Sequence, residues 1–323
     1  MRLGFAVKVL GQPTLKSNDS RRWQNGPHLS VSLAYVRDIL VYIRKVGIRM
    51  YRLSSDLAPY ITHPDLPQFH SQVAQCVTEL EDIGALARED DVRLSFHPGA
   101  HVVLNSPDDT IASKSVADLE KQAELLDAMG LDQRAVVVIH VGGVYNEKQA
   151  ATDRFVGRWH EISGRTRNRL VLENDARNFS VDDIADIHQR TGIRLLFDYL
   201  HHLSNNPSGL GTREAVDQCL DTWPPGVTPK VHFSSPRTEM RVTERRDSRT
   251  GKMEHVLKPP LWDQHADFVN SWEFIAFLEE TQHLRDFDVM LEMKAKDLAL
   301  LRLREGLRKF APEWASKFEE QPA

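Results

Sequence analysis

Leu170–Asp175, with the sequence LVLEND, is a short apolar stretch that ends on two carboxylates on either side of Asn174. Seven further segments have the same form, an apolar run that ends on or close to polar or ionisable residues: Arg2–Val7, Met50–Ser54, Val92–His97, Ala135–His140, Ile193–Asp198, Pro229–Phe233 and Phe287–Glu292. An uninterrupted apolar run such as 135–139 is typical of a parallel strand covered on both faces. Eight strands with helix-length segments between them predict a (β/α)8 barrel with its functional site at the C-terminal ends of the strands.

The connecting segments predict the helices of this barrel. Apolar residues recur at helical spacing from Leu33 to Val46, and Gly47 stops the pattern. Further helices are expected at about 69–89, 113–129, 147–162, from about Ser180, and at about 265–284, with a last helix that fades after Ala311-Pro312. The length of 323 residues fits one barrel domain over 1–323, in which about 297–323 form a C-terminal helix and tail.

Composition and charge are those of an ordinary soluble globular protein, with 27% charged residues and a formal net charge of −5. This charge gives no global reason to expect a nucleic-acid partner. The segment Arg237–Lys258 is nevertheless basic, and it is either a solvated loop or a local rim that steers DNA. Cys76 and Cys219 lie far apart, which favours a reducing cytosol. No signal-peptide pattern and no apolar run of about 18 residues is visible, so we expect a cytoplasmic protein without a membrane partner.

The predicted strand ends gather an unusual number of metal-binding side chains at one rim. They are His97, His140, Glu173, Asp198, His201, His232 and Glu292, with His265 from the insertion that follows. One histidine or one carboxylate at such a place is usually a structural hydrogen-bonding residue or a helix cap. Five imidazoles and three carboxylates around one axis would instead leave like charges in a poorly solvated pocket. Divalent cations remove that cost, so the sequence predicts a polynuclear metal site.

The mixture of ligands indicates both the metal and the chemistry. Histidine together with carboxylate suits Mn, Fe or Zn better than Ca or Mg. Several metals sharing a bridging carboxylate can hold both oxygens of an in-line phosphoryl displacement, which predicts a hydrolase. Glu173, central in the strand order, is the expected bridge. No Gly-rich phosphate loop, GxSxG elbow or Walker lysine competes with this interpretation.

These residues lie in ordered motifs that resemble the UV-damage endonucleases. The motifs are RLSSDLAPYITHP at Arg52–Pro64, SFHPG at Ser95–Gly99, HVGGVYNEK at His140–Lys148, LENDAR at Leu172–Arg177, DYLHH at Asp198–His202, PKVHFSS at Pro229–Ser235 and LEMKAK at Leu291–Lys296. The resemblance covers about Arg2 to Lys296. It implies a TIM barrel related in architecture to the apurinic endonuclease IV enzymes. It also implies a DNA-repair endonuclease that nicks damaged double-stranded DNA immediately 5′ to cyclobutane dimers and 6-4 photoproducts, leaving a 3′-hydroxyl and a 5′-phosphate.

The resemblance further implies three metal ions, typically manganese, and assigns residues to them. His97, His140 and Glu173 would hold the first, and Glu173, Asp198, His232 and Glu292 the second. His201 and His265 would belong to the third, with Lys230 nearby. In the family this lysine can be carboxylated, although a phosphate-contacting lysine is the open alternative. His63 matches an active-site histidine of the family, and it could equally be a turn residue.

The motifs that recognise the lesion depart from the family pattern. Ala100 and His101 follow the His-Pro-Gly where the family has a glutamine and an aromatic residue that wedge into the duplex. Histidine can still stack on a base. Phe5 and Val9 stand where the family has a tyrosine and an asparagine, and we expect Phe5, Ala100, His101 and Lys294 to form the DNA or lesion contacts. The range of lesions is therefore left open by the sequence.

Three functions remain under comparison. The first is the repair endonuclease described above, acting as a monomer in the cytoplasm at the nucleoid. The second is an apurinic endonuclease of the endonuclease IV kind, which would prefer abasic sites. The third is a sugar isomerase or epimerase on the same barrel, because a fold does not determine a function. A rim so rich in histidine favours three metals and thus the nucleases.

Overall fold

Eight short parallel strands form the centre of the computed structural model, which describes residues 1–319. Each strand lies within one of the eight predicted segments: β1 (Leu3–Ala6), β2 (Met50–Arg52), β3 (Arg93–Ser95), β4 (Val137–Ile139), β5 (Leu170–Glu173), β6 (Arg194–Leu196), β7 (Lys230–Phe233) and β12 (Asp288–Leu291). The predicted strands are thus confirmed, with ends that are slightly shorter than the apolar runs.

The strands close into a barrel through two isolated bridges. Five strands form one sheet in the order β3-β2-β1-β12-β7, and β4, β5 and β6 form a second. Phe96 bridges Val137 and so joins β3 to β4, while Asp198 bridges His232 and joins β6 to β7. All these pairings are parallel. The predicted (β/α)8 class is confirmed, and one of the two closing bridges is made by two candidate metal ligands.

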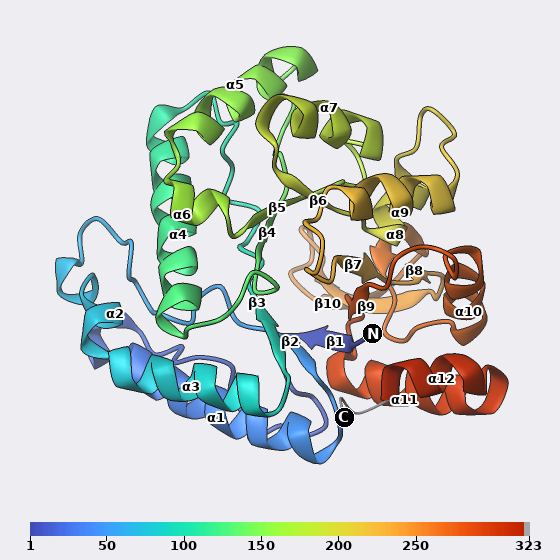
Figure 1. The fold of residues 1–323 in the computed structure, drawn as a ribbon, viewed down its shortest axis with the longest axis horizontal. Coiled ribbons are helices and arrows are strands. Elements are labelled where there is room, and N and C mark those ends of the chain that lie inside the picture. Colours follow the sequence, from blue (N-terminus) through green and yellow to red (C-terminus); the bar gives the residue numbers. More distant parts are fainter. Residues whose placement is uncertain (320–323) are drawn as a thin grey trace.

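Helices cover the outside of the strands on all sides (Figure 1). The seven that connect successive barrel strands are α1 (Leu29–Lys45), α3 (Val77–Glu89), α4 (Asp109–Ala128), α5 (Lys148–Glu161), α7 (Val181–Thr191), α9 (Thr212–Asp221) and α10 (Ser271–Glu280). An eighth, α11 (Lys296–Phe310), follows the last strand. Shorter elements are η1 (Trp23–Asn25), η2 (Pro67–Phe69), α2 (Gln72–Gln75), α6 (Gly164–Arg167), α8 (Tyr199–Ser204) and α12 (Pro312–Glu319). None of the helices in residues 1–319 is apolar over a length that could cross a membrane.

Several helix boundaries differ from the predicted ones for local reasons. The helix expected at 69–89 is divided into η2, α2 and α3. Helix α4 begins four residues before the predicted 113, because the Asp108 side chain accepts hydrogen bonds from the Thr110 and Ile111 amides and caps it. Helix α9 was not predicted. The helical structure does not stop at Pro312. A further helix, α12, begins there, because proline is tolerated in the first turn of a helix. Residues 320–323 of the expected tail lie outside the described part.

The prediction for the insertion after β7 is wrong in two respects. Part of Arg237–Lys258, expected as a loop, forms an antiparallel hairpin of β9 (Arg241–Arg246) and β10 (Met253–Lys258). Beneath it, β8 (Pro236–Arg237) pairs with β11 (Leu261–His265). His265, expected near the start of a helix, therefore ends a strand. Alternating apolar and polar residues at this length suit an antiparallel pair as well as a loop, and only the pairing partner decides between them.

The interior of the barrel is filled in layers, because alternate residues of a strand point to the same side. Arg93 contacts Asp288 at the N-terminal end of the strands. Ala6, Met50 and Met290 form a small apolar cluster in the middle. This packing requires glycine at position 4, since a Cβ atom there would lie 2.8 Å from the Met50 side chain. The remaining layer, at the C-terminal ends, is polar and forms the candidate site.

Candidate metal centre

The C-terminal ends of the strands bring the predicted ligands together at one end of the barrel. His140 comes directly after β4, and one residue separates His97 from β3 and Asp198 from β6. Glu173 and His232 lie within β5 and β7. Every second residue of a parallel strand points inward, so the strand ends deliver these side chains to a common layer.

Glu173 lies at the centre of this cluster and is fully buried. Its Oε1 atom is 2.9 Å from His232 Nδ1 and 3.4 Å from His201 Nδ1. Its Oε2 atom is 3.2 Å from His97 Nε2 and 3.6 Å from His140 Nε2. The single carboxylate therefore faces four imidazoles, two on each oxygen.

The side chains form three groups in which all ligand atoms lie within 4.8 Å of one another, and Glu173 belongs to each. The groups are His97, Glu173 and His232; His140, Glu173 and His201; and Glu173, Asp198, His232 and Glu292. The third group has the four residues that the resemblance implied for one metal. The other two groups differ from that assignment. It placed His97 with His140 and His201 with His265, whereas the structure groups His97 with His232 and His140 with His201.

His265 is held at the edge of the cluster and joins none of the three groups formed by the described residues. Its Nε2 atom lies 3.8 Å from Glu292 Oε2. On its other side Nδ1 shares a hydrogen bond of 2.7 Å with Ser234 Oγ, and the ring is 6.2 Å from that of His201. A ligand histidine is commonly oriented by a partner on its second nitrogen, and Ser234 supplies that partner here.

Asn174 orients two of the candidate ligands and was missed in the sequence. Its side chain accepts a hydrogen bond of 2.8 Å from the Asp198 amide and donates one of 3.2 Å to the Asp198 carbonyl. The backbone carbonyl of Asn174 accepts a hydrogen bond from His201 Nδ1 at 2.9 Å, which helps to fix the orientation of this ring. The side chain thus continues the β5–β6 ladder by one rung. A buried amide directly after a strand-end glutamate was the available signal.

Arg52 also was not assigned a role, although it ends β2 and points into the same layer. Its guanidinium forms a hydrogen-bonded ion pair with Glu292. It therefore supplies positive charge next to the cluster. The strand-end rule that selected the histidines applies equally to this arginine.

Lys230 lies one layer below the cluster, two residues before His232 on β7. It is fully buried, and its Nζ atom donates a hydrogen bond of 3.1 Å to Ser95 Oγ. Burial lowers the pKa of Lys230 well below its ordinary value, and the nearby Arg93 and Arg52 charges add to this. A neutral amine is therefore favoured at this place.

The protonation states of His97, His232 and Glu173 fit a site for cations, whereas His201 must lose a proton before it can bind one. Burial lowers the pKa of His232 to about 4 and also lowers the pKa of His97, so both are neutral imidazoles. Burial alone would raise the pKa of Glu173, but the imidazoles of His232 and His140 hold it well below its usual range, so this group is a carboxylate. Burial opposes protonation of His201 too, but Asp198 and Glu173 raise its pKa to about 10.

Unpaired buried atoms concentrate here as well. In the described part of the chain, five side-chain atoms of the cluster are buried without a hydrogen-bond partner: His97 Nδ1, His140 Nδ1, Glu173 Oε2, Asp198 Oδ2 and His232 Nε2. Buried polar atoms without partners are costly and are rare in proteins. Neutral imidazole nitrogens and carboxylate oxygens are the donor atoms that transition metals bind. The residues present therefore fit a group of divalent cations.

The predicted DNA-contacting residues lie outside the cluster, and one of them is buried. His63, Ala100, His101 and Lys294 are exposed. Phe5 is completely buried against Tyr51, with ring centroids 5.3 Å apart, and has no surface with which to contact DNA. The assignment of Phe5 is therefore corrected: its parity on β1 turns it toward the helices.

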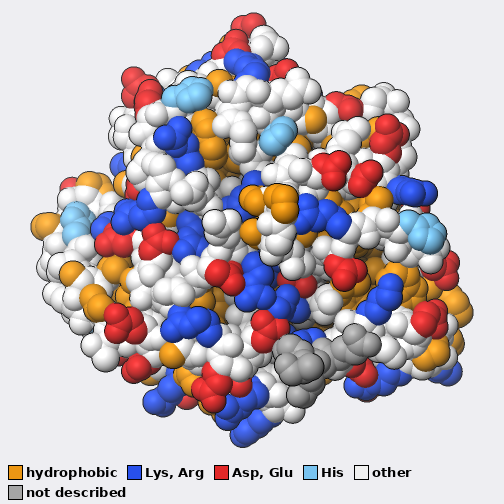
Figure 2. Space-filling view, in the orientation of Figure 1, with side chains coloured by type: hydrophobic (Ala, Val, Ile, Leu, Met, Phe, Trp, Pro, Cys, Tyr) orange, Lys and Arg blue, Asp and Glu red, His pale blue; other side chains and the backbone are white. Residues whose placement is uncertain are grey.

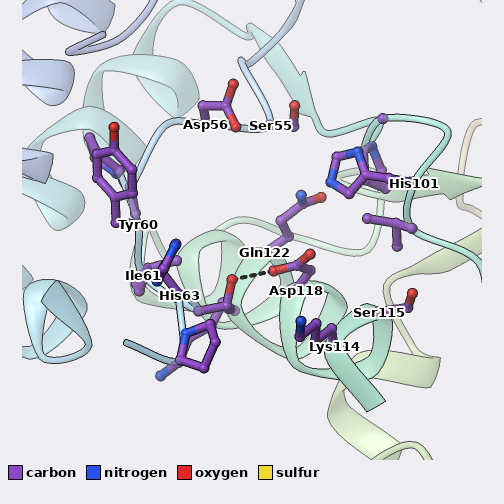
Figure 3. A pocket seen from close by; sticks show the side chains of 18 of the residues that line it. Ser55, Asp56, Tyr60, Ile61, His63, His101, Lys114, Ser115, Asp118 and Gln122 are labelled. Carbon is purple, nitrogen blue, oxygen red and sulfur yellow. Dashed lines mark hydrogen bonds between the residues drawn. The ribbon is translucent and has the colours of Figure 1, made fainter. Parts of the chain in front are cut away.

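His63 and His101 border a cavity of about 1060 Å³ beside the metal centre. Figure 3 shows the two histidines on opposite sides of this space, with Asp118 and Gln122 of α4 between them in the view. The cavity is formed by the loops after β2 and β3 together with α4. None of the eight candidate ligands lines it. Both histidines thus lie at the wall of this cavity, and neither is brought among the candidate metal ligands.

The sequence matches one group of known proteins. A family model described as UV-endonuclease UvdE matches residues 28–313. The chain belongs to this family. The UV DNA damage endonuclease of Bacillus velezensis is 35% identical over 294 residues, which are 89% of this chain and 85% of that protein. That of Clostridium perfringens is 28% identical over 327 residues, with 98% of this chain and 73% of that protein covered.

Solved structures agree with this family and with the fold. The crystal structure of SacUVDE superposes with a TM-score of 0.77 at 28% identity, covering 96% of this chain and 98% of that one. A D-psicose 3-epimerase from Clostridium cellulolyticum H10 superposes with a TM-score of 0.52 at 12% identity, covering 99% of this chain and 100% of that one. The second likeness shows a shared barrel and nothing about activity. The predicted family is confirmed.

Proposed function

We propose that the protein is a metal-dependent DNA-repair endonuclease that hydrolyses the phosphodiester immediately 5′ to UV photoproducts in double-stranded DNA. The photoproducts are cyclobutane dimers and 6-4 photoproducts, and the products carry a 3′-hydroxyl and a 5′-phosphate. The observation that carries the proposal is the position of Glu173 in all three ligand groups. Membership of the UV-endonuclease family supports the choice of substrate over the sugars that related barrels bind.

The ligand groups support a set of three metal ions, for which we propose manganese. Glu173 would be shared between them, with His97, His140, Asp198, His201, His232, His265 and Glu292 as the other ligands. When bound, such ions activate water and neutralise the charge that develops on a phosphodiester during in-line displacement. Histidine together with carboxylate favours Mn²⁺ over Mg²⁺.

The protein supplies orientation and charge around this group. Asn174 holds the backbone of Asp198 and the ring of His201 in place, and Ser234 does the same for His265. Arg52 balances the charge of Glu292. Asp198, His201, His265 and Glu292 are therefore held in place before substrate arrives, so these four ligands need little reorganisation during the reaction.

Lys230 is proposed to act through its unprotonated amine. A neutral amine adds CO₂ to form a carbamate and releases one proton, which turns the side chain into an anionic ligand next to the cluster. The alternative, a cationic lysine that contacts phosphate, requires a proton that burial disfavours. The mass of the intact protein under native conditions would distinguish the two.

Damage is recognised, in this proposal, through the weakened duplex. A photoproduct lowers the cost of unstacking, so an enzyme can select it without reading the base sequence. His101 would stack on a base, with Ala100, His63 and Lys294 lining the DNA path. His101 and His63 border the cavity next to the metal centre, which supports this assignment.

Nicking of an end-labelled duplex with one cyclobutane dimer tests the proposal. It is assayed with Mn²⁺, with EDTA, and with the variant Glu173→Gln, beside an abasic duplex and an undamaged one. The expected result is a metal-dependent cut 5′ to the dimer and a loss of about 10³-fold or more in Glu173→Gln, as for other central active-site groups. Cleavage of the abasic duplex alone would reassign the protein to the endonuclease IV kind. Cleavage of neither would refute a nuclease function.

A further inference from the structure

The insertion between β7 and α10 projects a two-stranded ribbon from the metal centre. We call residues 241–258, which form β9, β10 and their turn, the ribbon (Figure 1). Its base is the β8–β11 pair, which begins after Ser234 and ends at His265. Those two residues share a hydrogen bond of 2.7 Å, and His265 Nε2 lies 3.8 Å from Glu292. Whatever the ribbon binds is therefore held at a set distance from the candidate metal site.

The segment from Arg237 of β8 to the end of β10 carries positive charge on an acidic protein. Residues 237–258 contain seven Lys and Arg and four Asp and Glu, a net charge of +3, whereas the whole chain has −5. On the face shown in Figure 2, by contrast, basic and acidic side chains are interspersed. The excess concentrates at the tip, in Arg245, Arg246, Arg249 and Lys252.

These four side chains are not neutralised by the protein. Across residues 1–319 none of them forms an ion pair with a carboxylate. The one acid of the tip, Asp247, has its carboxylate turned to the backbone, where it accepts hydrogen bonds of 2.9 and 2.6 Å from the amides of Arg249 and Thr250. Asp247 thus shapes the turn and leaves the cations available for an outside partner.

One face of the ribbon carries three exposed apolar side chains, together with Glu244, Arg246 and His255. Residues opposite each other in the ladder share a face, which places Val242 with Leu257 and Arg246 with Met253 on one side. Val242, Leu257 and Met253 are 66%, 56% and 59% exposed. On the other face Thr243 and Val256 are half-buried, whereas Arg245 near the tip is exposed. Exposed apolar side chains next to unpaired cations are typical of a binding surface.

We propose that the ribbon is an arm that binds the DNA duplex to one side of the scissile phosphate, with its tip on backbone phosphates and the side chains of Val242, Met253 and Leu257 in a groove. The proposal rests on the nuclease function above and extends it to the flanking duplex. A two-stranded ribbon fits the major groove, which is about 12 Å wide, and apolar side chains contact groove walls while arginine and lysine bind phosphates. A second copy of the chain would bring like charges together on this face, which disfavours it as the occupant.

The length of the arm determines where on the DNA it acts. Strands of six residues span about 20 Å, which is about half of a helical turn of about 34–36 Å. The arm therefore reaches duplex that is undamaged, beyond the bases at the lesion. It grips DNA on one side of the nick only, because a single insertion carries it.

The test compares a tip variant, Arg246→Gln/Arg249→Gln/Lys252→Gln, with a matched control, Arg37→Gln/Lys45→Gln/Lys309→Gln. The control removes three exposed charges from α1 and α11. Binding to an undamaged duplex of about three helical turns is measured with Mn²⁺ over a range of salt. The tip variant is expected to bind at least about 10-fold more weakly, with a salt slope shallower by about 2–3, since each lost phosphate contact removes about 0.9. Equal affinity and slope for tip and control variants would overturn the proposal.

Two further readouts separate the alternatives. The tip variant should still nick a dimer-containing duplex at saturating concentration, because its substituted residues lie outside the metal centre. If the wild type nicks no duplex, the nuclease function is refuted. The binding comparison of tip and control variants would still decide whether the arm binds DNA. Shortening the duplex on one side of the lesion should weaken DNA binding by the wild type, whereas the DNA affinity of the tip variant should not change. A wild type that tolerates shortening on either side, or a tip variant that loses self-association in sedimentation with unchanged DNA affinity, would instead refute the arm.

Discussion

The two ends of the barrel interior both contain buried charge, but they balance it in opposite ways. At the N-terminal end, Asp288 is fully buried and lies 2.9 Å from Arg93 and 3.1 Å from Arg2, and Arg2 continues to Asp91 at 2.6 Å. At the C-terminal end, Glu173 is equally buried, yet it faces only imidazoles, and atoms of four of its neighbours lack hydrogen-bond partners.

The difference separates a structural charge from a functional one. Charges that are paired within the protein cost desolvation once and then contribute to a fixed fold. Donor atoms that converge without partners retain their capacity to bind, at a cost to the free energy of folding that a cation can offset. Burial of charge thus accompanies structural ion pairs at one end of the barrel and the candidate metal site at the other.

The largest effect on stability is expected from Asp288→Asn at the paired end. The substitution leaves the buried guanidinium of Arg93 without its carboxylate, which should lower the free energy of unfolding by about 3–5 kcal/mol. Denaturant unfolding with and without Mn²⁺ measures it. Asp286→Asn is the matched control, because Asp286 is exposed and forms no ion pair with any residue from 1 to 319. An equal effect of both substitutions would remove the distinction between the two ends.

Metal binding should stabilise the opposite end specifically. Mn²⁺ at 100 times its dissociation constant is expected to raise the free energy of unfolding by about 2.7 kcal/mol through mass action. The increment should vanish with EDTA and in Glu173→Gln, and it should persist in Asp288→Asn. Thermal unfolding of the three proteins across a Mn²⁺ titration measures it, and an increment that survives in Glu173→Gln would place the metals elsewhere.

Removing the orienting amide should weaken the site without dismantling it. In Asn174→Ala the backbone of Asp198 loses two hydrogen bonds, and metal affinity should fall by about 10–100-fold. Nicking would then recover at higher Mn²⁺, which a general loss of folding would not allow. Asn205→Ala is the control, since Asn205 bonds the Asp175 carbonyl outside the cluster. Activity that stays low at saturating Mn²⁺ would contradict an orienting role.

The smallest effect concerns acid stability at the paired end. Burial raises the pKa of Asp91, but its hydrogen-bonded ion pair with Arg2 outweighs this and lowers it. A pKa that is lower in the folded state contributes stability above the unfolded value of about 3.9, and this contribution is lost as the pH falls through the folded pKa. Asp91→Asn should therefore cost up to about 1 kcal/mol at pH 7, since Asp91 is one-quarter exposed. The difference from wild type should disappear in strong acid, and one that persists there would have another cause.

Much of the barrel and the content of its site were predictable from local sequence. Apolar runs that end on histidine or a carboxylate identify both a strand and its functional end, because side chains at the ends of parallel strands converge. For this reason Glu173, His232 and Asp198 were predicted to lie together, and they do. The helix boundaries were less predictable where a cap such as Asp108 moves the start of a helix.

Other features depended on contacts between distant segments. Asn174 gains its role from the backbone of Asp198, 24 residues further on, and Phe5 loses its expected DNA contact because it packs against Tyr51. The grouping of His97 with His232 and of His140 with His201 depends on where the barrel closes. The ribbon needed a pairing partner to become a hairpin.

The sequence by itself determined which side chains stand at the strand ends, since the period of two and the apolar runs are local properties of the chain. Only the tertiary structure decided which of these charges are neutralised inside the protein and which remain unpaired, because pairing requires residues as far apart as Arg93 and Asp288 to meet. That difference distinguishes the structural end of this barrel from its candidate metal centre.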